Sequence, residues 1–72
     1  MDEIMLAFIT ANISAVTREV DKLLVKEDDV NVRVIEQFIV RSLTGRTQCP
    51  LLKQGIKKNS RKIIDHFAEA IV

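Results

Sequence analysis

Seventy-two residues suffice for one domain, and 47% of them are apolar, although a domain of this size buries only about 60% of its unfolded surface. The chain has no Trp or Tyr and only three Phe, which excludes an aromatic platform for stacking bases. The formal net charge is +1, yet residues 1–36 carry eight acidic and four basic side chains, and residues 37–72 carry seven basic and two acidic ones.

Residues 3–26 are predicted to form one long helix, beginning beside Asp2 and Glu3, where the helix dipole favours carboxylates. Its apolar residues follow spacings of 3, 4, 3, 4 and 3, an a/d pattern over about two and a half heptads that we call the heptad seam. The heptad seam consists of Leu6, Ile9, Ile13, Val16, Val20 and Leu23.

The length of this helix favours a homodimer. It would span roughly 36 Å, whereas a compact chain of this size has a diameter of roughly 29 Å. An overhanging seam is most simply covered by a second copy, which makes the seam the expected dimer or partner interface. The alternative is that helices of the same chain cover it.

Residues 30–44 are predicted to form a second helix, capped by carboxylates of the run 27–29 and closed by Gly45 in a left-handed conformation. Val32, Ile35, Phe38, Ile39 and Leu43 would face inward, and Arg33, Glu36, Gln37 and Arg41 outward. Alternating valines at 30, 32 and 34 leave a short strand over 30–35 as a competitor.

Pro50 suits the first turn of a third helix, from which Leu51, Leu52 and Ile56 would point inward. Gly55 and the polar residues 57–60 interrupt the pattern before a last helical stripe begins at Ile63. Whether residues 50–71 form one kinked helix or two stays open. The expected fold is therefore a small all-α bundle of about three helices, completed by homodimerisation.

A basic segment stands out in this region, with five cations within ten residues: Lys53, Lys57, Lys58, Arg61 and Lys62. Lys53, Lys57 and Arg61 are spaced so that a continuous helix would align them in one ridge. Such a ridge can be a solvated helix face, or it can contact an acidic protein surface or nucleic acid.

The segment 47–66 loosely resembles a helix-turn-helix unit, with Gly55 and the apolar Ile56 at the turn and Ile64 inside the second helix. The resemblance implies that the second helix would enter the major groove of DNA through its N-terminal residues. Those residues would be Asn59, Ser60 and Lys62.

Catalytic and metal-binding patterns are lacking in the sequence. Cys49 and His66 are single, with no orienting partner or ligand spacing around them. We therefore expect a non-enzyme without metal or cofactor.

The single cysteine agrees with a reducing compartment, and the uncharged stretch 4–17 is too short to span a bilayer. We therefore expect a cytoplasmic protein that does not enter membranes.

The functional prediction is a small regulatory or adaptor protein that acts through helix-mediated protein–protein interaction, with a protein partner that the sequence does not identify. The alternative is a dimeric DNA-binding transcriptional regulator that uses residues 47–66. A component that is stable only within a larger complex is a third possibility.

Overall fold

Four helices make up the described part of the chain, which in this computed structural model comprises residues 2–71 without the side chains of residues 70 and 71. They are α1 (Glu3–Lys26), α2 (Val32–Thr44), α3 (Pro50–Lys58) and α4 (Ser60–Ile71). The all-α prediction is confirmed, with four helices in place of about three. No helix in this part combines the length and apolar character that crossing a membrane requires.

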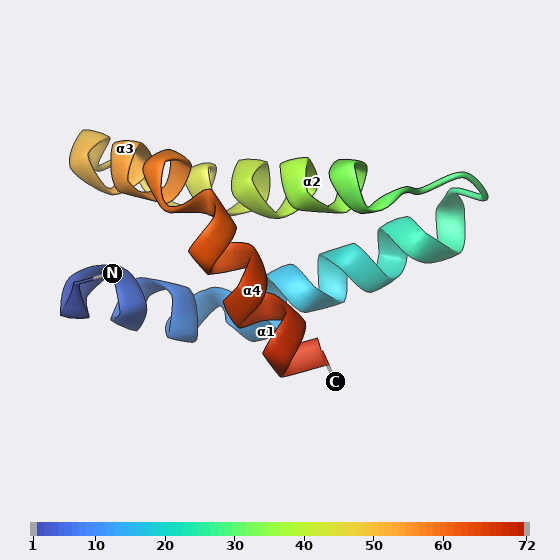
Figure 1. The fold of residues 1–72 in the computed structure, drawn as a ribbon, viewed down its shortest axis with the longest axis horizontal. Helices are drawn as coiled ribbons and strands as arrows, with labels where there is room; N and C mark the ends of the chain where they lie inside the picture. The colour runs from blue at the N-terminus through green and yellow to red at the C-terminus, as the bar shows by residue number, and fades with distance from the viewer. Residues whose placement is uncertain (1, 72) are drawn as a thin grey trace.

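The helices form two rows that α4 joins (Figure 1). Helix α1 runs the length of the molecule, and α2 lies antiparallel to its C-terminal part while α3 covers its N-terminal part. Helix α4 then crosses α1 and also packs against α2. The molecule measures 35 × 22 × 19 Å, with a radius of gyration of 11.8 Å. The prediction that α1 overhangs the rest of the chain is wrong. The molecule is elongated, and α2 and α3 together lie beside α1 along its length.

The heptad seam contributes to the core of the single chain. Ile9, Val16 and Val20 are buried, Ile13 and Leu23 are half-buried, and the side chain of Leu6 is 42% exposed. All four helices supply buried residues to this core, which consists of Met5, Ile9, Val16, Val20, Ile39, Leu43, Ile56, Ile63 and Phe67. The buried seam residues therefore have no free surface left for a second copy in this arrangement, and a homodimer stays a prediction.

The helix ends show which local signals act. Asp2 caps α1 through Oδ1, which accepts a hydrogen bond from the Met5 amide at 2.8 Å. Asn31 caps α2 in the same way, accepting from the Val34 amide at 2.9 Å. The prediction that residues 27–29 cap this helix is wrong, because Asn31 is closer to the first turn and residues 27–29 form an exposed turn. The competing strand over 30–35 is not formed.

Three other predictions about single residues are wrong. Val32, predicted to face inward, is 69% exposed, because it is the first residue of α2 and lies beside the turn between α1 and α2. Gly45 has φ −72° and ψ −13°, a right-handed conformation, because the Arg46 amide donates to the Leu43 carbonyl and closes the helix without a left-handed residue. Leu51 is 77% exposed, because it lies in the first turn of α3 on the side away from the core. Pro50 does begin α3, as predicted.

Gly55 lies inside α3, where it allows close packing of α3 on α1. A Cβ atom at this position would lie 2.4 Å from Cε of Met5. Such a distance is far below van der Waals contact, so the methionine would have to move. The sequence pattern suggested an interruption at Gly55, whereas the structure uses the missing side chain for packing.

We predict that the stability effect of Gly55→Ala depends on Met5. In a Met5→Ala background the substitution should stabilise the protein by about 1 kcal/mol, because alanine favours a helix interior over glycine. In the wild-type background the collision with Met5 should offset this gain, giving a coupling of at least about 0.5 kcal/mol. Chemical denaturation of the four proteins measures the coupling, and equal effects in both backgrounds would contradict the packing role.

A second prediction tests where the heptad seam packs. Val16→Asp should unfold the chain, because an unpaired buried carboxylate costs several kcal/mol and the whole domain is stable by roughly 4–11 kcal/mol. Leu6→Asp should change the unfolding free energy by less than about 1 kcal/mol, because the site is partly exposed and a carboxylate is favourable near the N-terminus of α1. Thermal melts by circular dichroism distinguish the two; unfolding by Leu6→Asp would show that the whole seam is covered.

Candidate interaction groove

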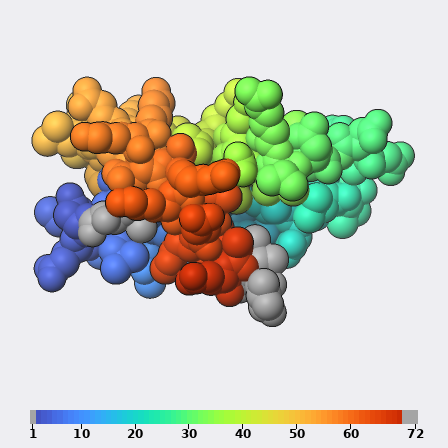
Figure 2. All heavy atoms as spheres, viewed as in Figure 1, coloured from blue at the N-terminus to red at the C-terminus, as the bar shows by residue number. Residues whose placement is uncertain are grey.

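An open groove of about 760 Å³ runs between α2 and the α3–α4 segment. Both sides lie on the face shown in Figure 2, where the green atoms of α2 meet the orange atoms of α3 and α4. We call it the α2–α4 groove. It is larger than a second hollow of about 330 Å³ beside Ile13 and Asp21 on α1.

Helical periodicity explains which side chains of α2 reach the α2–α4 groove. Arg33, Gln37, Arg41 and Thr44 are three or four positions apart and so share one face of α2. The core residues Ile39 and Leu43 lie on the opposite side of that helix. The packing of α2 on α1 therefore turns its polar face toward the groove.

Positive charge dominates the groove, which contains four cationic side chains and one carboxylate: Arg33, Arg41, Lys57, Arg61 and Glu36. The only ion pair among these five joins Arg61 to Glu36 at 3.5 Å. Because the Arg61 side chain is 81% exposed, solvent screens this pair and it adds little stability. The groove has an excess of three positive charges, whereas the net charge of the whole chain is +1. The positive electrostatic potential is therefore concentrated at the groove.

Apolar surface lies between the charges. Val40 of α2 and Ile64 of α4 are half-buried and line the floor of the α2–α4 groove. Gln37, Thr44 and Ser60 add groups that can donate or accept hydrogen bonds. A cationic rim over an apolar floor suits a ligand that is both acidic and apolar.

The predicted basic segment is divided by the structure. Lys57 and Arg61 line the α2–α4 groove, whereas Lys53, Lys58 and Lys62 are exposed outside it. The continuous ridge of the sequence interpretation is absent because the helix ends at Asn59, whose Nδ2 donates to the Gly55 carbonyl at 2.9 Å. Residues 50–71 are thus two helices.

The other two groove cations, Arg33 and Arg41, come from α2. Sequence reasoning placed them on the outer face of that helix but assigned them no role. Their spacing of eight residues, two helical turns, was a signal that they share a face. That face meets Lys57 through the contact of α2 with α3, and Arg61 through the contact of α2 with α4.

The helix-turn-helix resemblance matches the structure only in part. Two short helices do follow each other, but the turn lies at Asn59, four residues after Gly55. Asn59 and Ser60 are half-buried, and Lys62 is exposed. Two of the three residues that the resemblance assigns to the DNA contact are thus partly covered in the single chain.

Cys49 and His66 lie on different elements. Cys49 is exposed and precedes α3, and its side chain makes no capping hydrogen bond. His66 is half-buried on α4. Within residues 2–71 no three His, Cys, Asp or Glu side chains form a group that could hold a metal ion.

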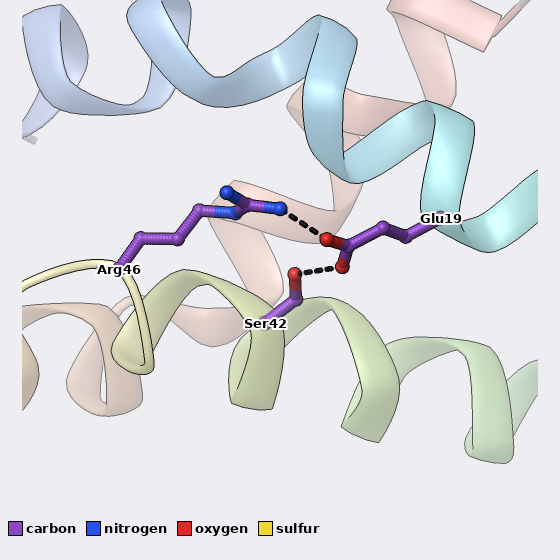
Figure 3. Close-up of polar contacts among 3 residues, drawn as sticks. All are labelled: Glu19, Ser42 and Arg46. Carbon is purple, nitrogen blue, oxygen red and sulfur yellow. Dashed lines mark hydrogen bonds and ion pairs between the residues drawn. The ribbon is translucent and has the colours of Figure 1, made fainter.

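A separate polar cluster connects α1 to the end of α2 (Figure 3). The Glu19 carboxylate accepts a hydrogen bond from Ser42 Oγ at 2.7 Å and forms an ion pair with Arg46. The cluster is partly buried and joins residues 23 and 27 positions apart in the sequence. Its arrangement is that of a structural clamp between the two helices.

Comparison with protein-family models, curated proteins and solved structures finds no match to this chain. Function is therefore inferred from the geometry of the α2–α4 groove.

The clamp has a measurable contribution to stability. Glu19→Gln should lower the unfolding free energy by about 1 kcal/mol, because hydrogen bonds to charged groups contribute about 1.5–3 kcal/mol and partial exposure reduces that value. Glu69→Gln, at an exposed position of α4, is the matched control and should have almost no effect. Urea denaturation measures both, and equal values would show that the clamp adds no stability.

Proposed function

We propose that this chain is a small, non-enzymatic regulatory or adaptor protein that binds an acidic helical segment of a protein partner in the α2–α4 groove. The observation that carries the proposal is the rim of four cations over a floor of Val40 and Ile64. Helix-in-groove recognition combines these features, since an amphipathic helix places apolar anchors on the floor and charges at the rim.

An acidic protein segment fits this groove better than nucleic acid does. A phosphate backbone offers no apolar side chains for Val40 and Ile64, and Glu36 would repel it. The chain has no Trp or Tyr to stack on bases. A net charge of +1 also gives only a weak long-range attraction for polyanions.

The DNA-binding alternative is favoured by one observation. Lys53, Lys58 and Lys62 are exposed near the groove cations in the sequence, so a wider basic surface could neutralise several phosphates. This surface differs from the groove in having no apolar floor. Variants can therefore separate the two functions.

The proposal includes a cytoplasmic location and a homodimer. The single, exposed Cys49 favours a reducing compartment. A chain of 72 residues with exposed apolar side chains at both ends of its long axis favours association with a second copy.

We predict that two double charge-reversal variants distinguish these functions. Arg41→Glu with Lys57→Glu should weaken the binding of acidic amphipathic peptides at least about tenfold, or about 1.4 kcal/mol. Lys53→Glu with Lys62→Glu changes the net charge equally outside the groove and should weaken it less than about threefold. Fluorescence anisotropy with labelled peptides and with duplex DNA measures both ligands.

Two different results would contradict the proposed function. Duplex binding that both double variants reduce equally, with a log–log salt slope near −0.9 per phosphate contact, would support the DNA-binding alternative. Peptide binding that is the same in wild type and groove variant, or absent from both, would contradict the groove as an acidic-segment site.

A further inference from the structure

The turn between α1 and α2 is an exposed acidic element at one end of the long axis (Figure 1). Glu27, Asp28 and Asp29 are all exposed, and no ion pair within residues 2–71 involves them. We call these three residues the acidic turn. Their capping role is taken by Asn31, so the carboxylates are available for another contact.

The face of α2 that lines the α2–α4 groove continues toward the acidic turn. Val32 lies four positions before Glu36 and eight before Val40, so the three share one side of the helix. Val32 is 69% exposed, although an aliphatic side chain gains stability from burial. An uncovered apolar residue thus links the acidic turn to the groove.

The acidic turn and the α2–α4 groove are complementary in charge. The turn carries three carboxylates, and the groove has an excess of three positive charges. The Arg41–Lys57 end of the groove lies away from the turn, because the turn precedes Val32 whereas Arg41 is in the last turn of the helix. Helix α2 has 13 residues and is roughly 20 Å long, so one copy cannot place its own turn at its own Arg41–Lys57 end.

From these observations we infer that the acidic turn of a second copy of this chain occupies the α2–α4 groove. Two α2 helices side by side and antiparallel would place each acidic turn beside Arg41 and Lys57 of the other copy. The arrangement is a closed two-fold dimer in which both contacts are equivalent. It would also cover Val32, which is exposed in the single chain.

This inference rests on the proposed function, because it uses the groove as a site for acidic protein segments. It adds a form of regulation: the second copy and an acidic partner would compete for the same cations. Dimerisation would then protect the groove until a tighter-binding partner displaces the second copy.

Charge reversal tests the inference directly. The turn variant carries Asp28→Lys and Asp29→Lys, the groove variant carries Arg41→Glu and Lys57→Glu, and a third chain carries all four changes. All four side chains are exposed, and circular dichroism verifies that each variant is folded. Sedimentation equilibrium at low salt measures self-association.

We expect the wild type to dimerise and to dissociate as salt increases, because about 1 M salt shortens the screening length to about 3 Å. Each double variant should be monomeric. The chain with all four changes should dimerise more tightly than either double variant but more weakly than the wild type, since its turn carries a net charge of +1 and its groove −1, in place of −3 and +3. An equal mixture of turn variant and groove variant should form a heterodimer. Lys53→Glu with Lys62→Glu should leave dimerisation unchanged.

A monomeric wild type at about 100 μM, or a turn variant that dimerises like the wild type, would overturn the inference. The turn variant also separates this failure from failure of the proposed function, because its groove is intact. If an acidic peptide binds its groove while dimerisation proves independent of the turn, only the inference fails. If the peptide does not bind the turn variant at all, the proposed function fails with it.

Discussion

Burial of the heptad seam from Ile9 to Val20 is the constraint on which the rest of the structure depends. A helix as long as the molecule cannot be covered by one shorter helix. The chain covers it with α2 over one part and α3 over the other, and α4 crosses to add Ile63 and Phe67 to the core. The turn at Asn59 follows from this arrangement, because α4 must leave the row of α2 and α3 to reach α1.

The same constraint creates the α2–α4 groove. Helix α2 packs on α1 through Ile39 and Leu43 and so directs its arginines outward. Helix α4 packs on α1 through Ile63 and Phe67, which leaves Ile64 beside Val40 and Arg61 beside Glu36. The cations of the groove lie together because the apolar faces of their helices are buried on a common helix.

The sequence pattern predicted those parts of the fold that are determined by residues close together in the chain. The bounds of α1, the start of α3 at Pro50 and the helical state of residues 32–44 follow from periodicity and backbone chemistry. The errors at Gly45, Leu51 and the second helix cap each concern a choice between two locally allowed states. Asn31 and the carboxylates of residues 27–29 are all good caps, and only the path of the chain between two packed helices selects one.

The candidate site was less predictable than the fold, because charge in a sequence does not specify which helix faces meet. Lys57 and Arg61 were visible as part of a basic segment, but their partners on α2 became apparent only from the packing of α2 against α3 and α4. Gly55 shows the same limit, since nothing near it in the sequence indicates the approach of Met5.

A heptad seam indicates that a helix needs partners, but it does not say whether they belong to the same chain. Here Ile9, Val16 and Val20 find them within the chain, so the surfaces left for association are of another kind. They are charged and carry scattered apolar residues such as Val32, and contacts of this kind are reversible and sensitive to salt. A dimer held by a continuous apolar seam would be permanent. A dimer held by the acidic turn and the α2–α4 groove could exchange its second copy for another acidic protein, which is the behaviour that a regulatory protein requires.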